Sequence, residues 1–333
     1  MSLPTIQDVA NHAGVSTATV SRAINSPNLV SKKTLLVVEK SVAELGFTPN
    51  FGGQVLASKR TNTIGAIIPT MDNAIFARGL QAFQAHLSEA GITTIVASTN
   101  YDTHAEATQI RKLVARGADA LLLIGDAREQ ATYDFLNKRK IPFVIAWEFQ
   151  DNPTKSFVGF DNYKAGQYIA RLVTEYGHKN IAMISGIHKM NDRARNRARG
   201  VRDYLDKHKI QLPIIEAEYK FSSAGVAFQK LLTEYPNLTT IICGNDVLAV
   251  GAIQKAKTMG LNVPRDISIT GFDDIDIAEV VSPALTTVHV PHRQMGVAAA
   301  ERLMEMTQSS PSVSKSIELS THVTIRDSLL RIW

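Results

Sequence analysis

The sequence predicts an α/β protein in which a small all-α helix-turn-helix domain precedes two doubly wound α/β subdomains. Two short apolar-periodic runs near the N-terminus are broken at Gly14. Strands and helices alternate from Ile64 onward, and a second alternating series begins near Asp161. Such alternation predicts parallel sheets with right-handed crossovers. A chain of 333 residues also exceeds what one hydrophobic core usually supports.

The N-terminal segment contains the start and stop signals of three helices. Thr5 and Ser16 can cap the first two helices, and Gly14 can take the positive φ that turns the chain between them. Ser31 can cap a third helix, expected over 32–45, with Gly46 after its end. Three helices with this spacing predict a helix-turn-helix unit over residues 1–48.

The second helix carries almost no side-chain bulk. Small hydroxyl and methyl side chains let its backbone approach the floor of a major groove about 12 Å wide, and Arg22 can reach guanine or phosphate. The first sixty residues hold six basic and three acidic residues, which favours a polyanionic partner. A helical hairpin that binds nothing remains the alternative on this pattern alone. The residues that we predict to contact DNA here are Thr5, Ser16, Thr17, Ala18, Thr19, Ser21, Arg22, Asn25, Ser31 and Thr34.

The stretch "TIQDVANHAGVSTATVSRAIN", followed by "VSKKT" and "LGFTPN", resembles the N-terminal signature of the lactose/galactose repressor family of bacterial transcription regulators. Further matches run to about residue 327. The resemblance implies a ligand-responsive transcription regulator, most often a repressor, that binds a near-palindromic operator as a homodimer. It also implies a body over 62–333 similar to periplasmic sugar-binding proteins. We expect one subdomain over about 62–160 and 291–320, and the other over about 161–290 and 321–333.

By the same resemblance, residues 49–61 form a hinge helix that enters the minor groove. Leu56 matches the wedging leucine, with Ala57 beside it and Asn50 near the DNA backbone. Gly52 and Gly53 depart from the family pattern, and each glycine costs a helix about 0.8–1 kcal/mol relative to alanine. We therefore expect this segment to order only on DNA. A plain flexible linker is the alternative, although it would leave Leu56 unexplained.

Ligands of open α/β sheets bind beyond the carboxyl ends of the strands. This rule selects Asn245, Asp273 and Trp147, together with Asn73 and Phe76 after the first strand of the body. The family resemblance implies effector contacts for Arg197, Asn245 and Asp273, a set that suits a sugar or sugar derivative, with Trp147 or Phe221 available to stack on a ring. Family members commonly carry aspartate near Trp147, and its replacement here points to a different effector.

The neighbouring polar residues have simpler interpretations. Asp246 is expected to cap the helix that follows it, and Asp274 and Asp276 are expected to be surface or capping groups. A core position is the alternative for Trp147. The remaining arginines of the segment "RARNRARGVR" are expected on a solvated helix face: Arg193, Arg195, Arg199 and Arg202.

Several functional classes lack their sequence signals. No nucleophile elbow, G-x-G-x-x-G or phosphate-binding loop follows a strand, so no enzyme, catalytic residue or cofactor is predicted. The histidines show no metal-ligand spacing. No apolar run spans a bilayer and no signal peptide is seen, so we expect a cytoplasmic, nucleoid-associated protein without membrane contact. A sugar-binding transport protein is the alternative, but it would need export. The C-terminus lacks the heptads of a tetramerisation coiled coil.

Overall fold

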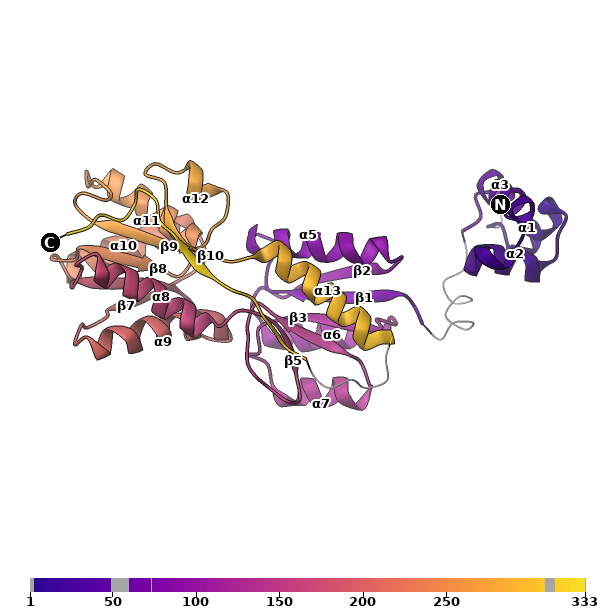
Figure 1. Ribbon diagram of the computed structural model, residues 1–333, viewed down its shortest axis with the longest axis horizontal. Helices are drawn as coiled ribbons and strands as arrows, with labels where there is room; N and C mark the ends of the chain where they lie inside the picture. Colours follow the sequence, from indigo (N-terminus) through magenta and orange to yellow (C-terminus); the bar gives the residue numbers. More distant parts are fainter. Residues whose placement is uncertain (1–2, 49–59, 73, 309–314, 333) are drawn as a thin grey trace. The chain divides into compact units, whose positions relative to one another are not determined.

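The computed structural model describes residues 3–48, 60–72, 74–308 and 315–332. The chain forms two compact units, Met1–Asn62 and Thr63–Trp333, which are described here one at a time (Figure 1). Asn50, Leu56 and Ala57 of the predicted hinge helix lie outside the described residues, and so does Asn73.

The described residues of the N-terminal unit form three α-helices and one short 3₁₀ turn. Its helices are α1 (Ile6–Ala13), α2 (Thr17–Asn25) and α3 (Lys32–Leu45), with η1 at Pro27–Leu29. All three predicted caps are confirmed, because the side chains of Thr5, Ser16 and Ser31 accept hydrogen bonds from backbone N–H groups of the first turns. Gly14 ends α1 with φ +66° and Gly46 ends α3 with φ +61°, as expected for left-handed caps.

The body of the protein contains two six-stranded sheets. The first has the order β11-β5-β4-β3-β1-β2 and is parallel throughout. Its strands are β1 (Thr63–Ile68), β2 (Thr93–Ser98), β3 (Ala120–Ile124), β4 (Phe143–Ala146), β5 (Ser156–Gly159) and β11 (Ile317–Glu318). We call this sheet the first lobe, together with α5 (Ala74–Glu89), α6 (Thr103–Ala115), α7 (Gln130–Lys138) and α13 (His292–Gln308).

The second lobe repeats the same topology. Its sheet has the order β12-β10-β9-β8-β6-β7, with only the β10–β12 pair antiparallel. The strands are β6 (Ile181–Gly186), β7 (Ile214–Ala217), β8 (Thr240–Cys243), β9 (Ser268–Asp273), β10 (Thr286–His289) and β12 (His322–Thr324). The helices are α8 (Asn162–Glu175), α9 (Asp192–Lys207), α10 (Phe221–Glu234), α11 (Asp246–Thr258) and α12 (Ile277–Val280).

The central strands of each sheet are buried on both faces because helices cover both faces, as in β1, β3, β4, β6, β8 and β9. In β1, Ile64 and Ile68 share a core cluster with α5 and α13, whereas Ile67 shares another with α6 and α7. The fold class predicted from the sequence is confirmed. The sequence did not predict β5, β7 and β10, each only four residues long.

The connections between the lobes and the order of the strands together indicate where a ligand is expected to bind. The chain passes between the lobes after β5, after β10 and after β11. In each sheet the strand order reverses beside the first strand, at the β1–β3 pair and at the β6–β8 pair. The carboxyl ends at these reversals are where doubly wound sheets bind ligands.

Helices α5 and α13 of the first lobe pack against each other through glycines. A side chain at Gly296 would collide with the backbone of Gly79, and a side chain at Gly79 would collide with the ring of Trp147. We predict that Gly296→Ala lowers the free energy of unfolding of the body by about 1–3 kcal/mol through overpacking. Urea denaturation followed by circular dichroism measures this change.

The matched control is Gly225→Ala in α10. A methyl group there meets its nearest neighbour, Lys255 Cβ, at an ordinary 3.5 Å. Because alanine favours a helix over glycine, this variant is expected to be more stable by about 0.5–1 kcal/mol. Equal shifts in the two variants would show that the α5–α13 contact does not depend on glycine.

Candidate functional site

Helix α2 of the N-terminal unit presents a face of small side chains. Val20 and Ala23 are buried against α1 and α3, which leaves Ala18 and Arg22 exposed on the other side. Thr17, Thr19 and Ser21 are half-buried. Ser16 Oγ lies 2.9 Å from Thr19 Oγ1, so capping occupies part of the hydroxyl-bearing surface that was predicted to face DNA.

The other predicted DNA-contact residues of this unit are also caps or surface groups. Thr5 is exposed and forms a capping box with Asp8. Ser31 is exposed, and its Oγ lies 2.8 Å from Thr34 Oγ1 at the start of α3. Asn25 is exposed at the end of α2, where its side chain donates to Ser21 Oγ at 3.3 Å. The structure thus places these groups at the surface ends of three helices.

A second site lies between the two lobes of the body. Residues from strand ends and helix starts of both lobes line a space of about 230 Å³ that opens to solvent, which we call the cleft cavity. Its lining residues are Ile75, Phe76, Tyr101, Asn191, Arg193, Arg197, Tyr219, Asn245 and Asp273. Four predicted effector contacts therefore meet here: Phe76, Arg197, Asn245 and Asp273.

Arg197 is fixed in the cleft cavity by three neighbours. Its Nη1 donates to the carbonyl oxygen of Gly244 at 2.6 Å and lies 3.9 Å from Asp273 Oδ1. The guanidinium also lies 4.2 Å from the centre of the Phe272 ring. Its Nε is buried without a hydrogen-bond partner among the described residues. A ligand acceptor could satisfy this donor.

Asp273 ends β9 with an unusual backbone conformation. Its φ is +108°, a region that residues with side chains rarely adopt. The side chain is 2 % exposed. Burial raises the pKa of Asp273 to about 7, although the charges of Arg197 and Arg193 oppose this shift. The carboxyl group can therefore accept a hydrogen bond from a ligand hydroxyl when it is ionised and donate one when it is protonated.

Helix α11 is capped by Asn245, whereas the sequence suggested Asp246 for this position. Asn245 caps α11, because its Oδ1 accepts from the Leu248 N–H at 2.9 Å, and its Nδ2 remains for the cavity. The prediction that Asp246 caps this helix was wrong. Asp246 is buried and accepts from the Ile275 N–H at 2.8 Å and from Thr287 Oγ1 at 2.5 Å, so it joins α11 to β10 and to the segment that follows β9.

Trp147 and Phe221 do not line the cleft cavity. Trp147 follows β4 with φ +62°, and its ring is 3 % exposed in the core, edge-on to Phe76. Its Nε1 donates to His292 Nδ1 at 3.2 Å, and His292 Nε2 lies 3.2 Å from the carbonyl oxygen of Asp273. Phe221 begins α10 and is 50 % exposed.

We expected four arginines of α9 to lie on a solvated helix face, and this prediction was wrong for Arg193. Arg195 and Arg199 are exposed, but Arg193 is 5 % exposed and lines the cleft cavity. Positions 193 and 197 are four residues apart and share one face of α9, which is the signal that could have identified it. Asp274 pairs with Arg326 at 2.8 Å and His289 at 2.9 Å, and exposed Asp276 pairs with Arg78.

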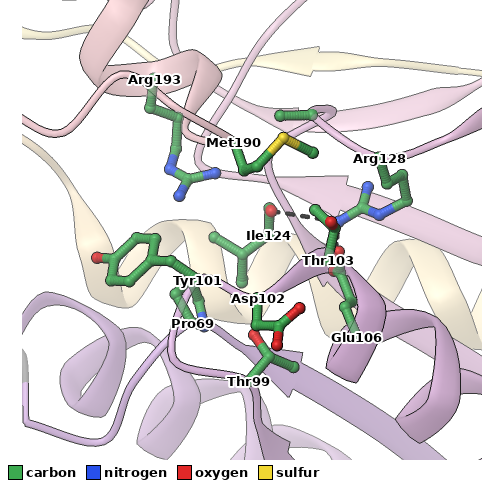
Figure 2. A pocket seen from close by; sticks show the side chains of 11 residues that line it. Pro69, Thr99, Tyr101, Asp102, Thr103, Glu106, Ile124, Arg128, Met190 and Arg193 are labelled. Atoms are coloured by element: carbon green, nitrogen blue, oxygen red, sulfur yellow. Dashed lines mark hydrogen bonds and ion pairs between the residues drawn. The ribbon is translucent and has the colours of Figure 1, made fainter.

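A second cavity adjoins the cleft cavity and shares Tyr101 and Arg193 with it (Figure 2). We call it the side cavity. Its charged residues are Asp102, Glu106, Arg128 and Arg193. Arg128 Nη2 donates to Glu106 Oε1 at 2.8 Å, so this pair is already neutralised.

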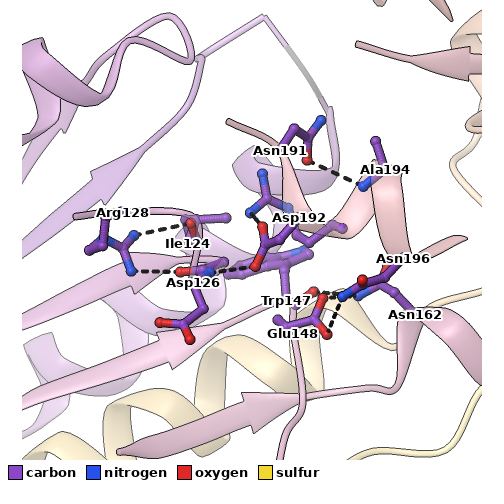
Figure 3. A network of polar contacts seen from close by, with 12 residues as sticks. Ile124, Asp126, Arg128, Trp147, Glu148, Asn162, Asn191, Asp192, Ala194 and Asn196 are labelled. Carbon is purple, nitrogen blue, oxygen red and sulfur yellow. Dashed lines mark hydrogen bonds and ion pairs between the residues drawn. The ribbon is translucent and has the colours of Figure 1, made fainter. Parts of the chain in front are cut away.

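Hydrogen bonds connect the lobes next to these cavities (Figure 3). The backbone N–H of Asp126 in the first lobe donates to Asp192 Oδ2 in α9 at 2.5 Å. Glu148, after β4, accepts from Asn196 Nδ2 at 3.2 Å and from Asn162 Nδ2 at 3.0 Å. Burial and the nearby charge of Asp192 raise the pKa of Glu148 to about 8.

The described part of the chain contains neither a metal-binding cluster nor a membrane-spanning helix. Its histidines, cysteine and carboxylates form no group that could hold a metal ion. None of its helices is both long and apolar enough to cross a membrane.

Comparison with known proteins identifies the two units. Residues 5–50 match the model of bacterial regulatory proteins of the lacI family, and residues 170–329 match the periplasmic binding protein-like domain. The chain is 31 % identical over 332 residues to the ribose operon repressor of Haemophilus influenzae, covering 98 % of this chain and 99 % of that protein. It is 32 % identical over 337 residues to the HTH-type transcriptional repressor PurR of Aliivibrio fischeri, covering 98 % and 99 %.

A solved structure agrees with these relatives. The crystal structure of the Lac repressor dimer bound to operator and the anti-inducer ONPF superimposes with a TM-score of 0.87 at 26 % identity, covering 99 % of this chain and 100 % of that one. The helix-turn-helix unit, the two-lobed body and full-length similarity to repressors lead to one conclusion. The chain belongs to the lacI family of bacterial regulatory proteins and is a DNA-binding transcription regulator with a ligand-binding body.

Proposed function

We propose that this regulator is a homodimeric repressor that binds a near-palindromic operator, and that a sugar or sugar derivative in the cleft cavity controls its binding to DNA. The observation that carries the proposal is the convergence of Arg197, Asn245 and Asp273 from separate elements on one cavity between the lobes. The names of the ribose operon repressor and of the operator-bound Lac repressor dimer support it. The protein would act in the cytoplasm, without catalytic activity or cofactor.

The donors and acceptors of the cleft cavity suit a polyhydroxylated ligand. Arg197 and Asn245 offer N–H donors, Asp273 offers acceptors, and the rings of Phe76 and Tyr101 supply apolar surface. A ligand that contacts both lobes would favour one arrangement of the lobes over others. The ligand can change the affinity for DNA only if it makes different contacts in the two arrangements of the lobes. The coupling free energy between ligand binding and DNA binding is typically about 1–3 kcal/mol.

Exposed apolar side chains on the second lobe support self-association. Phe221 and Val226 on α10 and Val280 on α12 are 50 %, 70 % and 78 % exposed. Apolar side chains are enriched at homodimer interfaces, and a two-fold dimer presents its two DNA-binding units to a palindrome. The exposed position of Phe221 fits this role better than a role in the cleft cavity.

The central experiment measures binding of the purified chain to genomic fragments and to random duplex, at several salt concentrations, with and without candidate sugars. We expect one preferred fragment, salt-dependent affinity, and a change in that affinity on sugar addition. Sugar binding without any DNA preference would instead support the alternative of a solute-binding protein. No DNA preference under any condition contradicts the proposal.

We predict that Thr17→Val changes the sequence preference of the regulator. The substitution keeps the shape of the side chain but removes its hydroxyl, and a single base contact is worth about 1–3 kcal/mol of discrimination. Selection from a randomised operator pool reads the preference directly. Glu39→Gln on exposed α3 is the control and should leave the selected sequence unchanged. An unaltered preference in the Thr17 variant would place base recognition on other residues.

We predict that Arg197→Lys abolishes the response to the effector while DNA binding persists. Lysine cannot keep the bond to Gly244 and present a planar fork to a ligand, so effector affinity should fall at least about tenfold. Calorimetry and operator titrations measure the two effects. Arg199→Lys is the matched control on the exposed face of the same helix. A normal response in the Arg197 variant would remove this residue from the site.

We predict that Glu148 makes the stability of the body depend on pH. The folded pKa of about 8 exceeds the ordinary value of 4.5, because of burial and Asp192, against Arg193 and the Asn196 hydrogen bond. Between these two pH values the folded chain retains a proton on Glu148 that the unfolded chain loses. The contribution of Glu148 to the free energy of unfolding therefore decreases as pH rises from about 4.5 to about 8. Glu148→Gln removes this loss, which is on the order of a few kcal/mol. Urea titrations at pH 5.5, 7 and 8.5 measure the free energy of unfolding of both proteins. As pH rises, the variant should become more stable relative to the wild-type protein, and a difference that does not change with pH would contradict this prediction.

A further inference from the structure

Two buried arginines line one cavity from the same helix. Arg193 and Arg197 stand one turn apart on α9 and are 5 % and 6 % exposed. Both line the cleft cavity, and Arg193 also lines the side cavity. Like charges at this spacing repel, and a buried charge is costly unless it is paired. The arrangement needs a compensating negative charge.

Hydrogen bonds within the protein satisfy Arg193 only in part. Its Nη1 donates to Asp192 Oδ1 at 3.2 Å, and no other hydrogen bond of this guanidinium occurs within the described residues. Asp192 is itself anchored, because its Oδ2 accepts from the Asp126 N–H of the other lobe at 2.5 Å. Asp192 does not line either cavity. The remaining N–H groups of Arg193 therefore have no acceptor on the cavity wall that the described residues supply.

The charges that face the cleft cavity do not balance. Two guanidinium groups meet one carboxyl group, that of Asp273, which is held by Arg197 at 3.9 Å. The other polar lining residues are neutral: Tyr101, Asn191, Tyr219 and Asn245. In the side cavity, Glu106 pairs with Arg128 and Asp102 caps α6, so Arg193 forms no ion pair with a carboxylate that lines either cavity. Its one ion pair comes from behind the cavity wall, from Asp192 at 3.2 Å, and its remaining N–H donors suit the single carboxylate of a monoanion.

We propose that the effector is a sugar acid, whose carboxylate pairs with Arg193 while its hydroxyl groups contact Arg197, Asn245 and Asp273. This inference rests on the proposed function, namely that a sugar derivative occupies the cleft cavity. A carboxylate matches the planar fork of a guanidinium with two parallel hydrogen bonds. Arg193 then determines which class of sugar binds, because a neutral sugar leaves the N–H donors of Arg193 that Asp192 does not engage without a carboxylate partner.

The test compares matched ligands on the full chain. Thermal shifts and calorimetry are measured with aldonates and uronates (D-gluconate, D-galactonate, D-glucuronate), the corresponding neutral aldoses, and sugar phosphates. We expect at least one carboxylate-bearing sugar to bind and to change operator affinity, with its matched aldose at least tenfold weaker. A stronger response to an aldose or to a phosphate overturns the sugar-acid inference and leaves the proposed function intact. No response to any member contradicts both.

Three substitutions on α9 locate the carboxylate. Arg193→Gln is expected to weaken binding of the sugar acid at least tenfold and that of its aldose much less, whereas Arg195→Gln, on the exposed face, should change neither. Arg193→Lys retains the charge and should recover part of the affinity. Equal losses for acid and aldose in Arg193→Gln would mean that Arg193 is not the carboxylate partner.

The wild-type chain offers a test that needs no variant. Asp273 has a pKa of about 7, and its charged or titratable neighbours are Arg193 and Arg197 on α9, Asp246 on α11, Asp274, Tyr101 and His292, whose Nε2 bonds the carbonyl oxygen of Asp273. Protonation of Asp273 removes a negative charge near the ligand. The affinity for a sugar acid should therefore rise as pH falls from 8 to 6.5, whereas an aldose that donates to ionised Asp273 should bind more weakly. Falling affinity for the acid over this range contradicts the inference.

Discussion

The neutral imidazole of His292 is the contact on which the two-lobed arrangement of the site depends. A carbonyl oxygen can only accept, so His292 Nε2 must carry the hydrogen that bonds Asp273. The indole of Trp147 can only donate, so His292 Nδ1 must be unprotonated. Both nitrogens are thereby fixed, and burial lowers the pKa of His292 to about 3, which keeps the ring neutral. One side chain at the start of α13 therefore joins the end of β9 to the end of β4.

This contact relates the cleft cavity to the helices of the first lobe. Asp273 faces the cavity with its carboxyl group and bonds His292 with its carbonyl group. Trp147, on the other side of His292, packs where α5 and α13 meet at Gly79. A displacement of Asp273 would stretch one bond of His292 or transmit the movement to α13. Packed cores respond to such strain by discrete shifts rather than by continuous deformation.

The sequence predicted the fold from features that burial imposes directly. The runs of β1, β3 and β4 are buried at every position and almost entirely apolar because both faces are covered, and such runs are recognisable. The strands that were not predicted are short, and β7 is half-exposed at an edge with a charged residue, Glu216, so its pattern is weak. Helix caps were predictable because Thr5, Ser16 and Ser31 act on N–H groups two or three residues away.

Individual site residues were less predictable, because strand ends fix where a backbone lies and not where a side chain points. Trp147 follows β4 as expected, but its left-handed backbone directs the ring into the core. Asn245 and Asp246 are both good capping residues, and only the tertiary position of Ile275 and Thr287 assigns Asp246 to them. Arg193 looked like one of several surface arginines, and only its position four residues before Arg197, on the same face of α9, could have indicated its burial.

The permanence of the arginine charge explains why Arg193 matters more than its neighbours. Burial between the lobes moves the ionisable groups toward their neutral forms: the pKa of Glu148 rises to about 8, that of Asp273 to about 7, and that of His292 falls to about 3. A guanidinium, by contrast, stays protonated in proteins. Arg193 and Arg197 are therefore the cavity charges that burial does not remove, and carboxylates must compensate them. Asp192 pairs with Arg193 at 3.2 Å and Asp273 lies 3.9 Å from Arg197, and the N–H donors that these two carboxylates leave free are the ones that we propose for the ligand.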